Sequence, residues 1–133
     1  MSETSDRRVS ITIDRPAEEV SAFAGDPAKL PRWASGLATG IRREGDQWFA
    51  DSPMGAIEVR FVSDEPGVLD HEVVFPDGTV NHNPMRVLAV GEHGAASEVV
   101  FTVQRRDGMT DEQFDEDCAT VLGDLQKLRE LLS

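Results

Sequence analysis

The C-terminal part of the sequence is predicted to form one long amphipathic helix, and this helix constrains the rest of the fold most. Thr110 and Gln113 form a capping box at its start, with Asp111 and Glu112 in the first turn. An apolar stripe follows at helical spacing: Phe114, Cys118, Val121, Leu122, Leu125, Leu128 and Leu132. About 23 residues form a rod of roughly 34 Å. Because such a rod is too large to cap a sheet edge, we expect it to lie across the apolar face of a sheet.

The middle of the sequence is predicted to form consecutive strands joined by tight turns. The turn signals are short segments rich in Gly, Pro and Asp, such as residues 44–46 and 76–78. Apolar residues alternate with polar ones between the turns, as in Ile57, Val59 and Phe61. The predicted strands cover residues 37–44, 46–51, 55–63, 68–75, 79–90 and 95–106. Short turns imply an antiparallel meander with one apolar face.

The N-terminal part supplies one more strand and two short helices. Residues 9–13 alternate between apolar and polar, as in a half-buried strand, and Pro16 followed by acidic residues favours a helix start. Residues 26–33 begin with Asp-Pro and are predicted to form a second short helical piece. We expect residues 1–6 to be a flexible tail and residues 7–133 to form a single domain.

Composition narrows the function classes. The net charge is −12, and residues 61–133 contain 5 basic and 15 acidic side chains. Such a surface repels phosphate, and the apolar runs are short, so we expect no nucleic-acid partner and no membrane insertion. Cys118 is the single cysteine, which excludes an internal disulfide and disfavours a structural zinc site. We therefore expect no metal and no cofactor and, without a visible signal segment, a cytoplasmic location.

Three parts of the sequence carry a resemblance to a known family. The first is Val9-Ser-Ile-Thr-Ile-Asp-Arg-Pro-Ala-Glu-Glu-Val20, a strand, a proline and an acidic helix start. The second is Asp26-Pro-Ala-Lys-Leu-Pro-Arg-Trp33, and the third is the C-terminal helix with Met109–Phe114 and Leu122–Leu128. In order and spacing they resemble small bacterial members of the START-related, polyketide cyclase/dehydrase-like (SRPBCC) superfamily. Phe23 stands where a tryptophan is commoner in larger members.

The resemblance implies an α+β helix-grip fold. In that fold a seven-stranded curved antiparallel sheet wraps around the long C-terminal helix, with two short helices after the first strand and an apolar cavity between sheet and helix. The implied function is binding or transport of an apolar small molecule of the lipid, polyketide or quinone type. A polyketide cyclase/dehydratase-like enzyme and a protein-interaction module remain as alternatives, because a fold does not choose among functions. Either a monomer or a homodimer is expected.

Two histidines are the candidates for catalysis. If residues 76–79 form a four-residue hairpin loop, Val73 pairs with His82, and His71 lies diagonally beside His82 on the apolar face. Two imidazoles in a cavity could act as general acid and base on a carbonyl substrate. Ligand contact and a structural role are the alternatives, and a one-residue shift of register would turn one of the two outward.

Other candidate residues follow from the expected cavity. Arg86 could hold a ligand carboxylate if it faces inward, although Pro84 disrupts its strand and leaves the face undecided. Trp33 could pack in the core or contact a ligand, and Met85 could form an adaptable apolar wall. The predicted ligand-binding residues are Trp33, Phe61, His71, Phe75, His82, Met85, Arg86, Phe101, Val121 and Leu125.

Overall fold

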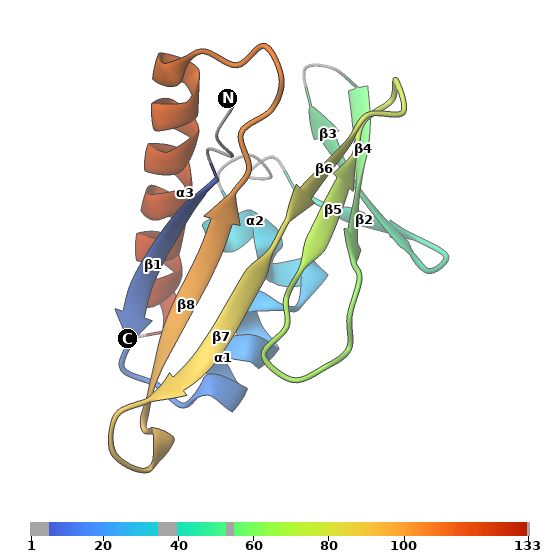
Figure 1. The fold of residues 1–133 in the computed structure, drawn as a ribbon. Helices are drawn as coiled ribbons and strands as arrows, with labels where there is room; N and C mark the ends of the chain where they lie inside the picture. Colours follow the sequence, from blue (N-terminus) through green and yellow to red (C-terminus); the bar gives the residue numbers. More distant parts are fainter. Residues whose placement is uncertain (1–5, 35–39, 53–54, 133) are drawn as a thin grey trace.

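The computed structural model describes residues 6–34, 40–52 and 55–132. It has strands, short helices and one long C-terminal helix in the order that the sequence predicts (Figure 1). The elements are β1 (Arg7–Ile13), α1 (Ala17–Ala24), η1 (Pro27–Lys29), α2 (Leu30–Trp33), β2 (Arg42–Glu44), β3 (Gln47–Ser52), β4 (Gly55–Phe61), β5 (His71–Val74), β6 (Val80–Asn83), β7 (Met85–Val90), η3 (Glu92–Gly94), β8 (Ala96–Val103) and α3 (Asp111–Leu131).

The strands form two antiparallel sheets, so the prediction of one seven-stranded sheet is wrong. One sheet has the order β1-β8-β7, and the other has the order β2-β3-β4-β5-β6. The eighth strand arises because Pro84 divides the strand expected at residues 79–90 into β6 and β7. A proline has no N–H to donate to a ladder, which explains the break at this position.

The segment just before β5 links the two sheets. The Leu69 N–H donates to the Met85 carbonyl at 2.8 Å, the Val87 N–H donates to the Gly67 carbonyl at 2.9 Å, and Val68 forms an isolated bridge with Arg86. This pairing continues the register of β5 with β6 past Pro84. The chain before β5 therefore borders the first sheet, while β5 itself belongs to the second.

Helix α3 begins as predicted. The Thr110 side chain accepts the Gln113 N–H at 3.1 Å, and the Gln113 side chain accepts the Thr110 N–H at 2.9 Å, which confirms the capping box. Its axis runs beside β1 and β8 (Figure 1). Buried α3 residues are Phe114, Cys118, Leu125 and Leu128. Leu122, predicted on the apolar stripe, is 37% exposed because it lies at the edge of that stripe.

The short N-terminal helices lie where the sequence predicts them. Val20 and Ala24 of α1 are fully buried, and the Asp26 carboxylate caps η1 by accepting the Ala28 N–H at 3.0 Å. Helix α2 ends with the buried Trp33. The first part of the strand expected at 37–44 lies outside the described residues. No described helix is long and apolar enough to cross a membrane.

Candidate functional site

A partly open cavity of about 370 Å³ lies between the second sheet and helix α3. Helix α2 closes one side, and Phe101 of β8 contributes from the first sheet. The lining is mostly apolar, with a small polar group formed by two asparagines, a histidine, a threonine and an aspartate. The described lining residues are Leu30, Trp33, Ala34, Ile57, Val59, His71, Val73, Phe75, Asn81, Asn83, Phe101, Thr120, Val121, Asp124 and Leu125.

The separation of the two sheets explains why an opening exists here. The Thr102 N–H donates to the Pro84 carbonyl at 2.9 Å, whereas β6 itself pairs with β5 rather than with β8. A groove of about 280 Å³ runs between β6, residues 103–106 and α3, and shares five lining residues with the cavity. These are Asn81, Asn83, Phe101, Thr120 and Val121. The groove therefore adjoins the cavity at the place where the strands diverge.

His71 is the titratable group whose environment in the cavity is best defined. Its Nδ1 lies 2.9 Å from the Leu69 carbonyl oxygen, and its ring contacts Phe61 and Phe101 at centroid distances of 5.4 and 5.8 Å. Burial lowers the pKa of His71 below its ordinary value of 6.5. The carbonyl can only accept, so Nδ1 carries the proton of the neutral ring. Nε2, at the far end of the ring, is then a hydrogen-bond acceptor.

A break in the ladder makes this carbonyl accessible to His71. Leu69 and Met85 are opposite each other, and a regular antiparallel pair would exchange two hydrogen bonds. The Met85 N–H instead donates to Asp70 Oδ1 at 2.9 Å. The Leu69 carbonyl then receives the imidazole N–H rather than the Met85 N–H. Asp70 therefore accepts the N–H that a regular ladder would direct to the Leu69 carbonyl.

Trp33 packs in the core and also borders the cavity, while its predicted contact with a ligand stays a prediction. The residue is 5% exposed and belongs to the hydrophobic core, and it also lines the cavity. Its Nε1–H is buried and has no hydrogen-bond partner among the described residues. A buried indole usually has such a partner. This donor is therefore a polar group that the described chain leaves unsatisfied beside an apolar cavity.

The predicted pairing of Val73 with His82 is wrong. Phe75 pairs with Thr79 around a three-residue loop, so that Val73 lies opposite Asn81 and His82 lies opposite Glu72. The reason is Gly78, whose φ of +91° is typical of a three-residue hairpin loop with a glycine at its end. The shift turns His82 to the outer face, away from His71, and its Nδ1 lies 3.0 Å from Glu72 Oε2.

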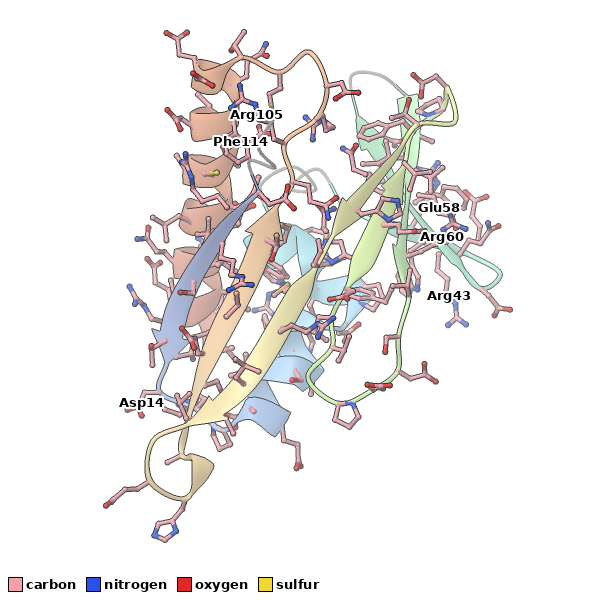
Figure 2. The ribbon with its side chains drawn as sticks, viewed as in Figure 1. Asp14, Arg43, Glu58, Arg60, Arg105 and Phe114 are labelled. Atoms are coloured by element: carbon pink, nitrogen blue, oxygen red, sulfur yellow. The ribbon has the colours of Figure 1, made fainter. Side chains whose placement is uncertain are left out.

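Arg86 also lies on the outer side of the sheet. It is exposed and forms a two-point ion pair with Asp70, with Nε–Oδ1 and Nη2–Oδ2 distances of 3.0 and 2.9 Å. The inward orientation considered for Arg86 is therefore not the one observed. Glu58 and Arg60 project from β4 on the face away from α3, as the alternation predicts (Figure 2).

The remaining predicted ligand residues divide into two sets. Phe75, Phe101, Val121 and Leu125 line the cavity. Met85 is 1% exposed in the core, and the Phe61 ring contacts His71 at a tilt of 50°. Neither residue belongs to the described lining.

Sequence reasoning missed the polar residues of the lining. Asn81 and Asn83 alternate with His82 and would have been found with a three-residue hairpin loop. Thr120 and Asp124 lie one turn apart beside the apolar stripe of α3. Such a position alone does not indicate that a polar residue lines a cavity. No group of three or more potential metal ligands occurs in the described ranges.

Comparison with known proteins identifies the fold. No protein-family model matches the chain, and no curated protein matches it. Solved structures do match. The Aha1 dimer from Colwellia psychrerythraea has a TM-score of 0.71 at 15% identity, covering 96% of this chain and 95% of that chain. A START superfamily protein from Mycobacterium smegmatis has a TM-score of 0.62 at 13% identity, covering 96% of each chain.

A third structure is DynU16, a protein in the dynemicin biosynthetic locus. It has a TM-score of 0.67 at 18% identity, covering 98% of this chain and 48% of that chain. At these identities the likeness establishes the fold alone. The chain has an SRPBCC-like, START-type α+β fold with a long C-terminal helix.

Proposed function

We propose that this protein binds or transports an apolar small molecule in the cavity between the second sheet and α3. The observation that carries the proposal is the cavity itself, which is lined mainly by apolar and aromatic side chains. Its volume of about 370 Å³ falls within the usual range for ligand sites, roughly 300–1,000 Å³. The buried Trp33 Nε1–H has no partner among the described residues, which supports the same proposal because a polar atom of a ligand would satisfy it.

The ligand is proposed to be of the lipid, polyketide or quinone type. The neighbours support this range, since one is a START superfamily protein and another is a protein of a biosynthetic locus. The residues proposed to contact it are Trp33, His71, Phe75, Phe101, Val121 and Leu125. A dehydratase acting through paired histidines is not proposed, because His71 and His82 lie on opposite faces of the hairpin.

The proposal is tested by native mass spectrometry of the purified protein, followed by solvent extraction of any co-purifying molecule. A cavity-filling variant, Val121→Trp, should lose the bound mass, because Val121 is half-buried and lines the cavity. Leu122→Trp is the matched control, since the neighbouring Leu122 is exposed. A bound molecule retained in Val121→Trp and lost in Leu122→Trp would place the ligand elsewhere.

The proposal also includes the boundaries of the domain and the oligomeric state of the protein. Residues 7–133 are proposed to act as a single domain, as a monomer or as a homodimer. The neighbouring Aha1 structure is a dimer. Analytical ultracentrifugation with and without an apolar ligand distinguishes the two states.

A further inference from the structure

The polar residues of the cavity lining bear on the charge of its ligand. The described lining contains neither Lys nor Arg, so it offers no cationic side chain to a ligand. Burying the carboxylate of a ligand without a cationic partner costs far more than burying a hydroxyl. The lining is therefore unfavourable for an acid such as a free fatty acid, and is compatible with an uncharged molecule.

The arginines of the adjoining groove form ion pairs with carboxylates of α3. Arg105 and Arg106 line the adjoining groove rather than the described cavity lining. Arg105 forms an ion pair with Asp111, and Arg106 Nη2 lies 3.5 Å from Asp117 Oδ2 on α3. A ligand carboxylate at the mouth of the cavity would have to compete with these helix carboxylates for the same cations.

His71 supplies the acceptor that an uncharged, hydroxylated ligand needs. Its Nδ1–H is bonded to the Leu69 carbonyl, and Nε2, the acceptor at the distal end of the neutral ring, has no hydrogen-bond partner among the described residues. Asn83 lies directly opposite His71 on the neighbouring strand and also lines the cavity. An amide offers both donors and an acceptor, so a hydroxyl that donates to Nε2 can also receive a hydrogen bond.

We infer that the cavity selects an uncharged aromatic or polycyclic molecule with a hydroxyl group that donates to His71 Nε2, and discriminates against the corresponding carboxylic acid. This inference rests on the proposed function and narrows its ligand class to phenol-like or alcohol-like molecules. The aromatic part of the ligand packs against the apolar walls formed by Trp33, Phe75 and Phe101.

Three probes of matched shape test the inference: 2-naphthol, 2-naphthoate and naphthalene. Each is titrated into the 15N-labelled protein at pH 7.5, and binding is followed by the amide and indole resonances. We expect 2-naphthol to bind roughly 2- to 10-fold more tightly than naphthalene, as expected for one net hydrogen bond. We expect 2-naphthoate to bind at least about tenfold more weakly than 2-naphthol.

Two histidine variants assign the preference to one residue. His71→Phe keeps a ring but removes the acceptor, so the preference for 2-naphthol over naphthalene should disappear. His82→Phe is the matched control on the outer face and should retain it. If His71→Phe does not fold, the imidazole 15N spectrum of the unmodified protein serves instead. The His71 Nε2 resonance should move toward its protonated position with 2-naphthol and not with naphthalene.

The outcomes separate the inference from the proposed function. Binding of 2-naphthoate as tight as that of 2-naphthol, or a hydroxyl preference unchanged in His71→Phe, would overturn the inference while the apolar binding site stands. Failure of all three probes to bind would overturn the inference, whereas the proposed function is overturned only if native mass spectrometry also finds no bound molecule.

Discussion

Asp70 holds Arg86 by two hydrogen bonds across the break between the two sheets, from Nε to Oδ1 at 3.0 Å and from Nη2 to Oδ2 at 2.9 Å. Asp70 Oδ1 also accepts the N–H of the buried Met85 at 2.9 Å. The Asp70 carboxylate therefore takes part both in a surface ion pair and in a hydrogen bond to the backbone. Both contacts lie beside Pro84, where the strand ladder is interrupted.

This arrangement predicts a loss of stability in acid. The hydrogen bonds from Arg86, with that from the Met85 N–H, lower the pKa of Asp70 below its ordinary value of 3.8. A lowered folded-state pKa stabilises the fold above pH 3.8, and the contribution is lost as the pH falls through the folded-state pKa. Asp70→Asn should be less stable at pH 6, by about 1 kcal/mol. Urea unfolding at pH 6 and pH 3 should show this difference shrinking, and an unchanged difference would contradict the assignment.

A second prediction concerns the tautomer of His71. In Asp70→Ala the Met85 N–H loses its side-chain acceptor and should return to the Leu69 carbonyl, which now accepts from His71 Nδ1. The His71 ring should then populate both neutral tautomers, visible as a change in its two 15N shifts. Arg86→Gln is the control, since Asp70 still accepts the Met85 N–H there. The same tautomer in Asp70→Ala as in the unmodified protein would show that Asp70 has no positioning role.

The helical part of the fold could be predicted from sequence because its signals are local. The capping box at Thr110 and the Asp-Pro start at Asp26 each satisfy backbone N–H groups within a few residues of themselves. Leu122 shows the limit of the pattern, because burial at the edge of an apolar stripe depends on what packs there. Local chemistry therefore predicts where a helix begins better than how far its buried face extends.

The sheet was harder to predict because register depends on a single turn residue. Gly78 in a left-handed conformation closes a three-residue loop, and this moves every pair of the hairpin by one position. His82 and Asn81 exchange faces as a result. The Pro-Asp-Gly sequence contained the signal, since a three-residue loop with glycine at its end is a common hairpin.

The candidate site could be predicted only in part for the same reason. The cavity lining includes His71, Phe75 and Phe101. These residues precede the hairpin loop or lie outside the hairpin, so their prediction did not depend on the length of that loop. Arg86 follows Pro84, and its side chain points outward because it pairs with Asp70. The two residues are 16 positions apart in the sequence. Such a pairing has no local signature.

A third prediction follows from the burial of His71. Its lowered pKa means that, as the pH falls below 6.5, the unfolded chain takes up a proton that the folded chain does not. Unfolding is therefore favoured as the pH falls from 6.5 toward the folded-state pKa. His71→Phe should lose this part of the pH dependence, measured by urea unfolding at pH 7.5 and 5.5. His93→Asn, in the exposed η3 segment, should retain it.

The last prediction compares two glycines that share a left-handed backbone but differ in their surroundings. Gly67 has a φ of +80° and Gly78 a φ of +91°. A Cβ on Gly67 would lie 2.7 Å from the Val87 carbonyl oxygen, whereas a Cβ on Gly78 would meet nothing within 4 Å. Gly78→Ala should therefore cost only the conformational penalty of about 1–2 kcal/mol.

Gly67→Ala should cost more than Gly78→Ala, because it adds a clash with backbone at the point where the chain before β5 pairs with β7. The Val87 N–H bonds to the Gly67 carbonyl there at 2.9 Å, so relief of the clash requires the two segments to separate. Free energies of unfolding from urea titration should differ in this order, with hydrogen exchange at the Val87 amide accelerated in Gly67→Ala alone. Equal losses of stability in the two variants would mean that the pairing of Gly67 with Val87 can open without cost. The segment before β5 would then not fix the relative position of the two sheets.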